Sequence, residues 1–67
     1  MKDRIQRYEI RTEVNVDVIA EVVRSVGGEL YEVNRSGLLR AGLSNVQLGD
    51  LRKKPGMASI DINLETE

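Results

Sequence analysis

The sequence predicts an α+β fold in which two helices cover one face of a four-stranded antiparallel sheet. Residues 4–14 and 57–64 alternate apolar and polar side chains, as half-buried strands do. Residues 16–26 space their apolar side chains three or four apart, and residues 45–54 carry a shorter apolar stripe. A polar turn separates two more strand-like runs between these helices. The predicted order is therefore β-α-β-β-α-β.

The first strand is predicted at residues 4–14, RIQRYEIRTEV, because its polar and apolar side chains alternate throughout. One side of this strand should face the core and the other should face solvent. The side facing the core should carry Tyr8, Ile10, Thr12 and Val14, and the other side Arg7, Glu9, Arg11 and Glu13.

The period changes at Asn15, which is a plausible N-cap for the first helix. Asp17 in the first turn is favoured there by the helix dipole. Gly27 and Gly28 supply the left-handed exit that the last turn needs. The expected buried stripe consists of Val18, Ile19, Val22, Val23 and Val26.

A hairpin is predicted from ELYEVNR and LLRAGLS, which flank a turn at Asn34 to Gly37. The second strand should turn Leu39, Ala41 and Leu43 toward the core. In the first strand the choice lies between Leu30 and the pair Tyr31 and Val33, and we favour the pair facing inward.

Ser44 and Gln47 have capping-box spacing at the start of the second helix. Pro55 should end that helix by about Lys54, because the residue before a proline is driven out of the helical region. Its apolar stripe is Val46, Leu48 and Leu51. The last strand begins at Met57, with Ala58, Ile60, Ile62 and Leu64 facing inward and Ser59, Asp61, Asn63 and Glu65 facing outward.

Right-handed crossovers place both helices on one side of the sheet, which is the ferredoxin-like arrangement. Residues 1–67 then form a single domain, and the other face of the sheet is open to solvent or to a partner. The side chains expected on this open face are Arg7, Glu9, Arg11, Glu13, Ser59, Asp61 and Asn63.

Composition excludes several classes of function. The chain has no cysteine and no histidine, so imidazole or thiolate catalysis and the usual metal sites are not expected. A net charge of -1 and an aromatic content of 3% argue against nucleic-acid binding. The longest apolar run, Val18 to Ala20, is three residues and does not span a membrane. We therefore expect no enzyme activity, no cofactor, no nucleic acid and no membrane partner.

Two charged features have simple structural readings. The pairs Asp61 with Glu65 and Glu9 with Glu13 lie on a wet sheet face, without the dry pocket that tunes catalytic carboxylates. The basic run at 52–54, RKK, sits in the last helical turn, where cations favour the helix dipole.

Residues 27–63, GGELYEVNRSGLLRAGLSNVQLGDLRKKPGMASIDIN, carry a resemblance to a known family. The helix that ends at Gly27-Gly28, the hairpin, the L-x-x-x-P-G segment at 51–56 and the closing strand occur in its order and spacing. The chain resembles the propeptide domain of subtilisin-like serine proteases and the free-standing protease inhibitors built on it. VIAEVVRSVGG and the first strand also fit, so the likeness covers most of the chain.

The resemblance implies a function in binding. In that family the open sheet face packs on two parallel surface helices of the protease, acidic residues of the last strand cap those helices, and the C-terminal tail lies substrate-like in the active-site cleft. By position, Asp61 and Asn63 are the helix-capping pair, although the family commonly has an acid where Asn63 stands. The C-terminal segment, which consists of Leu64, Glu65, Thr66 and Glu67, is the tail. Leu64 then fills an apolar pocket and Glu67 lies nearest to the catalytic serine.

We expect the partner to be a subtilisin-like serine protease, and the chain to be a monomer when free. A secreted or cell-envelope location follows if that protease is secreted. An alternative is a ferredoxin-like regulatory or self-association module without a protease partner, in which the alternating charges of the first strand pair across a two-fold axis. A third reading, nucleic-acid contact, rests on Arg52, Lys53 and Lys54 alone. The sequence leaves open whether the chain is a free inhibitor or a cleaved propeptide.

Overall fold

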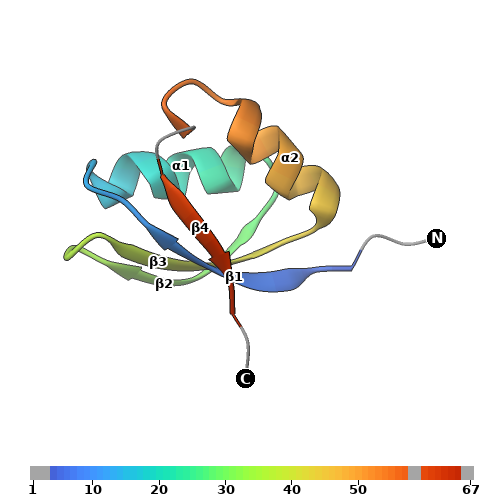
Figure 1. The fold of residues 1–67 in the computed structure, drawn as a ribbon, viewed down its shortest axis with the longest axis horizontal. Coiled ribbons are helices and arrows are strands. Elements are labelled where there is room, and N and C mark those ends of the chain that lie inside the picture. Colours follow the sequence, from blue (N-terminus) through green and yellow to red (C-terminus); the bar gives the residue numbers. More distant parts are fainter. Residues whose placement is uncertain (1–3, 58–59, 66–67) are drawn as a thin grey trace.

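The computed structural model describes residues 4–57 and 60–65 and has the predicted order of elements (Figure 1). Both helices lie on the same side of one four-stranded sheet, so the predicted α+β, ferredoxin-like fold is confirmed. The elements are β1 (Gln6–Arg11), α1 (Val16–Ser25), β2 (Glu29–Asn34), β3 (Leu38–Leu43), α2 (Asn45–Lys53) and β4 (Asp61–Leu64).

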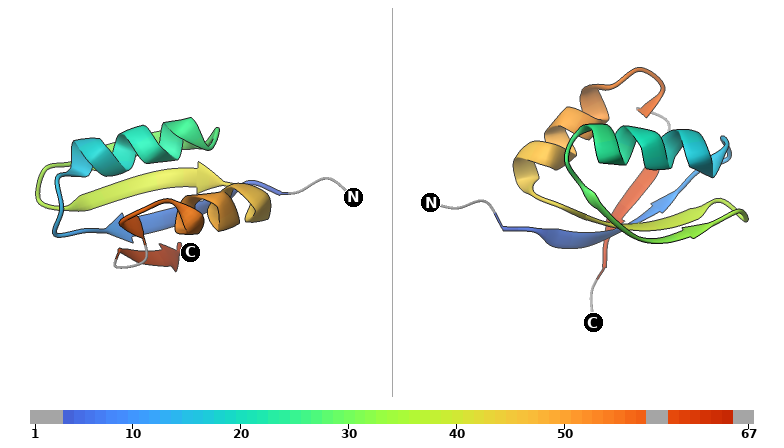
Figure 2. Two further views of the ribbon diagram at one scale, coloured as in Figure 1. Left: turned by 90° about the horizontal axis from the view of Figure 1, so that it is seen from above. Right: turned by 180° about the vertical axis from the view of Figure 1, so that it is seen from behind.

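The strand order is β2-β3-β1-β4, and every neighbouring pair is antiparallel. β3 and β1 are therefore the central strands, while β2 and β4 form the two edges (Figure 2). Ile10 of β1 lies between Leu39 of β3 and Ile62 of β4 in this register. The hydrophobic core thus forms between the central strands and the helices.

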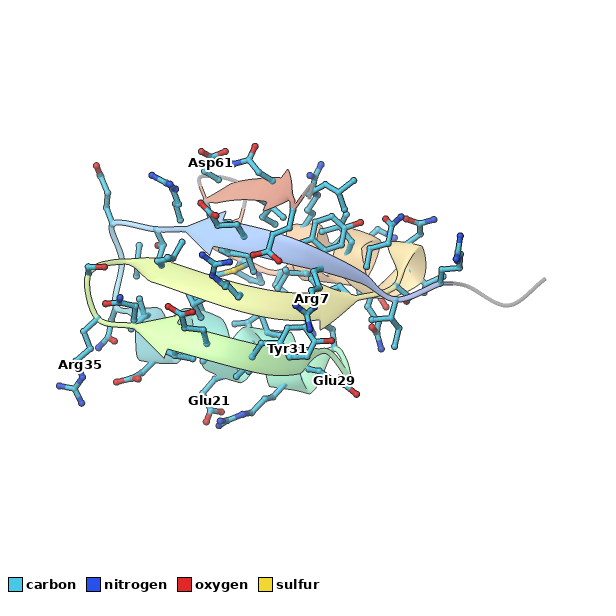
Figure 3. The ribbon with its side chains drawn as sticks, turned by 90° about the horizontal axis from the view of Figure 1, so that it is seen from below. Arg7, Glu21, Glu29, Tyr31, Arg35 and Asp61 are labelled. Carbon is cyan, nitrogen blue, oxygen red and sulfur yellow. The ribbon has the colours of Figure 1, made fainter. Side chains whose placement is uncertain are left out.

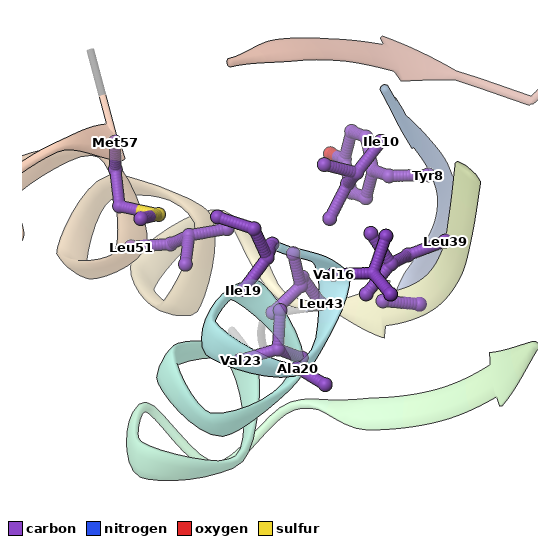
Figure 4. Close-up of a cluster of buried hydrophobic side chains, with 11 residues drawn as sticks. Tyr8, Ile10, Val16, Ile19, Ala20, Val23, Leu39, Leu43, Leu51 and Met57 are labelled. Carbon is purple, nitrogen blue, oxygen red and sulfur yellow. The ribbon is translucent and has the colours of Figure 1, made fainter. Parts of the chain in front are cut away.

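The core holds one cluster of buried apolar side chains, drawn from the central strands, both helices and the turn after α2 (Figure 4). Its members are Tyr8, Ile10, Val16, Ile19, Ala20, Val23, Leu39, Ala41, Leu43, Leu51 and Met57. The inward positions predicted for β3 are all among them. Because the cluster occupies only the helix-covered face, the opposite face keeps its polar side chains in solvent.

Helix α1 begins and ends as its sequence predicts, but its buried face is rotated from the predicted stripe. The side chain of Asn15 accepts a hydrogen bond from the Asp17 backbone N–H at 2.9 Å. Beyond its last turn Gly27 has φ +87°, the left-handed conformation that favours glycine. Val18, predicted to be buried, is 49% exposed, whereas Val16 and Ala20 are buried in its place.

Helix α2 begins with the predicted capping box. Gln47 donates its backbone N–H to the Ser44 hydroxyl at 3.2 Å, and its side-chain oxygen accepts from the Ser44 N–H at 3.0 Å. The Gln47 side-chain nitrogen also donates to the carbonyl of Gly27 at 3.0 Å, which ties the start of α2 to the end of α1. The helix ends at Lys53, as Pro55 requires. Val46 was expected in the buried stripe and is instead 66% exposed.

Strand β2 departs from simple alternation. The register of its pairing with β3 shifts between Leu30 and Glu32, so one extra residue is accommodated as a bulge. Leu30 packs against the core, and Tyr31, predicted to face inward, is 45% exposed on the other side of the sheet. Val33 pairs with inward-facing Leu39 but, on an edge strand, stays 40% exposed. The prediction was therefore wrong for Tyr31 and in leaving out Leu30, whereas Val33 lies on the helix side as expected.

Strands β1 and β4 are shorter than predicted. β1 ends at Arg11, and Val14, expected on its inward side, is 52% exposed in the connection to α1. β4 begins at Asp61, after Met57 has already entered the core. Positions 58 and 59, predicted as strand, lie outside the described residues.

Candidate functional site

The open face of the sheet, the side without helices, carries the predicted binding residues of β4 that point away from the core (Figure 3). Asp61 and Asn63 lie on it because they pair in register with Arg11 and Glu9 of β1. Central strand β3 adds Arg40, which lies opposite Glu9. Arg7, Glu9, Arg11, Asp61 and Asn63 are thus brought onto one continuous surface, as predicted. Of the other predicted outward residues, Glu13 lies beyond the end of β1 and Ser59 lies outside the described residues.

Asp61 and Asn63 are both exposed on edge strand β4. Neither side chain makes a hydrogen bond or ion pair with another residue in the described parts of the chain. Their oxygens therefore point into solvent with their accepting capacity unused. Aspartate and asparagine are also the side chains best suited to accept from the free N–H groups of a helix N-terminus.

A row of charges runs across the centre of the open face. The Nη1 of Arg40 lies 2.6 Å from the Oε1 of Glu65, and its Nε lies 3.4 Å from the Oε1 of Glu32. Because Arg40 is on β3 and Glu65 follows β4, their contact passes over β1. A second ion pair, between Arg11 Nε and Glu9 Oε1 at 2.8 Å, stays within β1.

Tyr31 and Arg7 form a separate group at the β2 side of the open face (Figure 3). The Arg7 Cζ lies 4.8 Å from the centroid of the Tyr31 ring, within range of a cation–π contact. The ring lies over Gly42 of β3, where any larger side chain would collide with the Tyr31 hydroxyl. That hydroxyl donates to Glu29 at 3.2 Å. Tyrosine and arginine, together with tryptophan, are enriched among the residues that contribute most of the binding energy in protein interfaces.

A shallow hollow lies on the open face along β1, bordered by residues of β3 and β4. The hollow is lined by arginines from β1, its N-terminal approach and β3, together with carboxylates from β4 and beyond. Its charged lining includes Arg4, Arg7, Arg11, Arg40, Asp61 and Glu65. It is open to solvent along its length, so its shape suits a protein surface better than a small molecule.

The C-terminal segment is described as far as Glu65. Leu64 is the last residue of β4, pairs with Tyr8 and is 48% exposed. The Glu65 N–H donates to the Arg7 carbonyl at 3.0 Å, so pairing with β1 continues one residue past β4. The other two predicted binding residues, Thr66 and Glu67, lie outside the described residues.

The remaining candidates lie elsewhere or are engaged by arginines. Arg52, Lys53 and Lys54 are exposed at the end of α2, on the helical layer and away from the open face. In the proposed carboxylate pairs, Glu9 contacts Arg11 and Glu65 contacts Arg40. Among residues 4–57 and 60–65, no three acidic side chains gather closely enough to hold a metal ion. Within those ranges no helix has the length and apolarity to cross a membrane.

The sequence patterns did not identify Arg40, Glu32 or Tyr31 as residues of the open face. Arg40 interrupts the apolar run LLRAGL, and its polar character in a buried strand was the available signal for an outward side chain. Its partner Glu65 is 25 positions away, and nothing local in the sequence links the two residues. Tyr31 could be placed on the open face only with knowledge of the bulge in β2.

Comparisons of the chain with protein-family models, with curated proteins and with solved structures found no match. The case for function therefore rests on the open face and on the resemblance described from the sequence.

Proposed function

We propose that this chain inhibits a subtilisin-like serine protease, or assists its folding as a propeptide, by binding alone. The open face docks on surface helices of the protease, and Asp61 and Asn63 cap the N-termini of those helices. The C-terminal segment, beginning at Leu64, lies substrate-like in the active-site cleft. The observation that carries the proposal is a helix-free sheet face that leads directly into that segment. This face carries two capping side chains that no residue among 4–57 and 60–65 engages.

The position of β4 supports the second half of this proposal. β4 is an edge strand, so Leu64 and Glu65 are bound by β1 on one side only. An extended segment with free backbone groups is what a protease binds when it adds a substrate strand to the edge of its cleft. Leu64, at 48% exposure, has apolar surface to bury in such a complex.

The Tyr31 and Arg7 group supports docking through the open face. It lies on the β2 side of that face, whereas Asp61 and Asn63 lie on the β4 edge. A partner covering both groups spans the whole width of the sheet. The Tyr31 ring is held in place because it contacts Arg7 and lies over Gly42. Little side-chain entropy is therefore lost when a partner packs on it.

The first test is Asp61→Ala in an inhibition assay against a panel of subtilisin-like proteases. Losing one helix cap costs about 1.4 kcal/mol, so we expect roughly tenfold weaker inhibition. Asp50→Ala is the matched control, because Asp50 is also exposed but lies on α2, in the layer opposite the open face. Equal effects of the two substitutions would contradict the proposed role of Asp61.

The second test addresses the C-terminal segment. Removing only Thr66 and Glu67 leaves every described residue in place, whereas a deletion from Leu64 onward also removes pairing with β1. We expect the two-residue deletion to weaken inhibition about tenfold or more, with urea unfolding unchanged. Leu64→Ala should weaken it by a similar factor, because burial of a leucine side chain contributes about 1.5 to 3 kcal/mol. If micromolar full-length chain leaves every protease of the panel uninhibited, the proposed function is wrong.

Self-association is the second candidate, and the exposed apolar surface on the open face favours it. Ile5 is 57% exposed and Tyr31 is 45% exposed, and both side chains lie beside Gly42. Two copies packed face to face would cover this surface. Light scattering at low micromolar concentration separates the candidates, because a dimer supports self-association and a monomer supports protease binding.

A further inference from the structure

The contact between Arg40 and Glu65 links the centre of the sheet to the start of the C-terminal segment. At 2.6 Å it is the shortest ion pair in the described parts of the chain. The Glu65 side chain is 19% exposed even though it follows the last strand, whereas the Arg40 side chain is 43% exposed. Glu65 is therefore the better covered partner, held against the sheet by an arginine two strands away.

Backbone pairing holds the same segment in the same place. Glu65 donates its N–H to the Arg7 carbonyl at 3.0 Å, and Leu64 pairs with Tyr8. Leu64 nevertheless leaves about half of its surface in solvent, at 48% exposure. The segment is thus held mainly by polar contacts on an open surface, which contribute on the order of 1 kcal/mol or less each.

These contacts compete with the complex proposed above. If Leu64 and Glu65 enter a protease cleft, they move away from their own sheet. The backbone groups that now pair with β1 must then be released, in addition to those already free on the outer side of the strand. The Arg40 contact must then open, because it fixes Glu65 over β1. Resting on the proposed function, we infer that Arg40 is a positioning residue: it holds Leu64 and Glu65 on the protein's own sheet until a partner takes them.

Glu32 makes this release less costly. The Nε of Arg40 is buried and has no hydrogen-bond acceptor among residues 4–57 and 60–65, although the Glu32 carboxylate lies 3.4 Å away. When Glu65 leaves, Arg40 can turn fully to Glu32 on the neighbouring strand. The guanidinium therefore exchanges one carboxylate for another and is not left unpaired on the sheet.

The free protein tests the holding role. We expect Arg40→Gln to speed hydrogen exchange of the Glu65 amide about fivefold, the factor that corresponds to an ion pair contributing about 1 kcal/mol. The exchange is compared with that of the Ile10 amide in the core, which should not change, so global unfolding is distinguished from local release. Arg11→Gln is the matched control, since its ion pair with Glu9 lies on the same face and stays within one strand. Arg40→Lys should retain most of the protection.

Unchanged exchange at Glu65 in Arg40→Gln would overturn the inference, and so would an equal acceleration in Arg11→Gln. This measurement needs no partner. A chain that inhibits no protease therefore disproves the proposed function, while the exchange data still decide whether Arg40 holds the segment.

Where a protease is inhibited, Arg40→Gln should strengthen inhibition by up to about fivefold, chiefly through faster association. The effect should vanish when Glu65 is already glutamine, because Arg40 acts through that carboxylate. Comparing Arg40→Gln, Glu65→Gln and the double variant separates this route from direct contact of Arg40 with the protease. Weaker inhibition by Arg40→Gln that persists in the Glu65→Gln background would overturn release as the role of Arg40.

Discussion

Ile10→Ala is expected to lower the free energy of unfolding by about 3 to 4 kcal/mol, within the range found for buried isoleucine truncated to alanine. Ile10 is fully buried on central strand β1, between cross-strand partners Leu39 and Ile62. A domain of 67 residues has about 3 to 10 kcal/mol of stability in total. The variant should therefore lose a large part of the total stability, and it is largely unfolded in water if the parent lies at the low end of this range.

The measurement is urea unfolding followed by circular dichroism, with Ile5→Ala as the matched control. Ile5 precedes the same strand but is 57% exposed, so its truncation should cost less than about 1 kcal/mol. Similar losses for the two variants would show that the core does not lie where the structure places it. Urea unfolding of the unsubstituted chain also bears on function, because a chain that folds stably alone favours a free inhibitor over a cleaved propeptide.

Gly37→Ala is expected to destabilise the protein by at least about 2 kcal/mol, for two reasons that act together. Gly37 closes the β2–β3 turn with φ +106°, a conformation that strains any residue with a Cβ. An added Cβ would also collide with the Thr12 carbonyl oxygen. The contact is close because the Thr12 N–H donates to the Gly37 carbonyl at 2.9 Å, which joins the hairpin turn to the segment after β1.

Two other glycines separate these causes. Gly56 has φ +83° but no heavy atom within 4 Å of an added Cβ, so Gly56→Ala should show the backbone strain alone, about 1 kcal/mol. Gly49 lies within α2 and also has no atom within 4 Å, so Gly49→Ala should stabilise by about 0.5 to 1 kcal/mol. In thermal or urea unfolding, Gly37→Ala should be the least stable of the three variants, Gly56→Ala intermediate and Gly49→Ala the most stable. A stabilising Gly37→Ala would contradict the turn geometry.

The element order and most element ends could be predicted because they depend on local chemistry. Asn15 caps α1 and Ser44 with Gln47 caps α2 through side chains adjacent to the backbone they bind. Pro55 ends α2 through a steric clash with its own neighbour. Such signals need no knowledge of tertiary structure, so the pattern of residues was sufficient to give the ferredoxin-like fold.

The predictions of side-chain direction failed where tertiary contacts decide which of several apolar residues is buried. Helix α1 carries valine at both Val16 and Val18, and the docking angle of the helix selects the first for burial. In β2, strict alternation could not place both Leu30 and Val33 on the helix side, since they are three residues apart. The bulge reconciles that spacing and moves Tyr31 to the open face.

The candidate site was predictable in part. Alternation placed Asp61 and Asn63 on the open face, because β4 is regular from Asp61 onward. The Arg40 contact with Glu65 was not predictable, since it depends on the strand order that brings residues 25 positions apart to either side of β1. Binding by these residues stays a prediction for the assays above.

The irregular register of β2 has a consequence for how the protein behaves in concentrated solution. An outer strand with evenly spaced free amides and carbonyls is a template for fibril growth, and an extra residue in its middle breaks that template. The other edge strand, β4, is protected differently, because it is only four residues long and carries the exposed side chain of Asp61. Both margins of the sheet thus resist uncontrolled strand addition, which favours solubility even with an uncovered sheet surface.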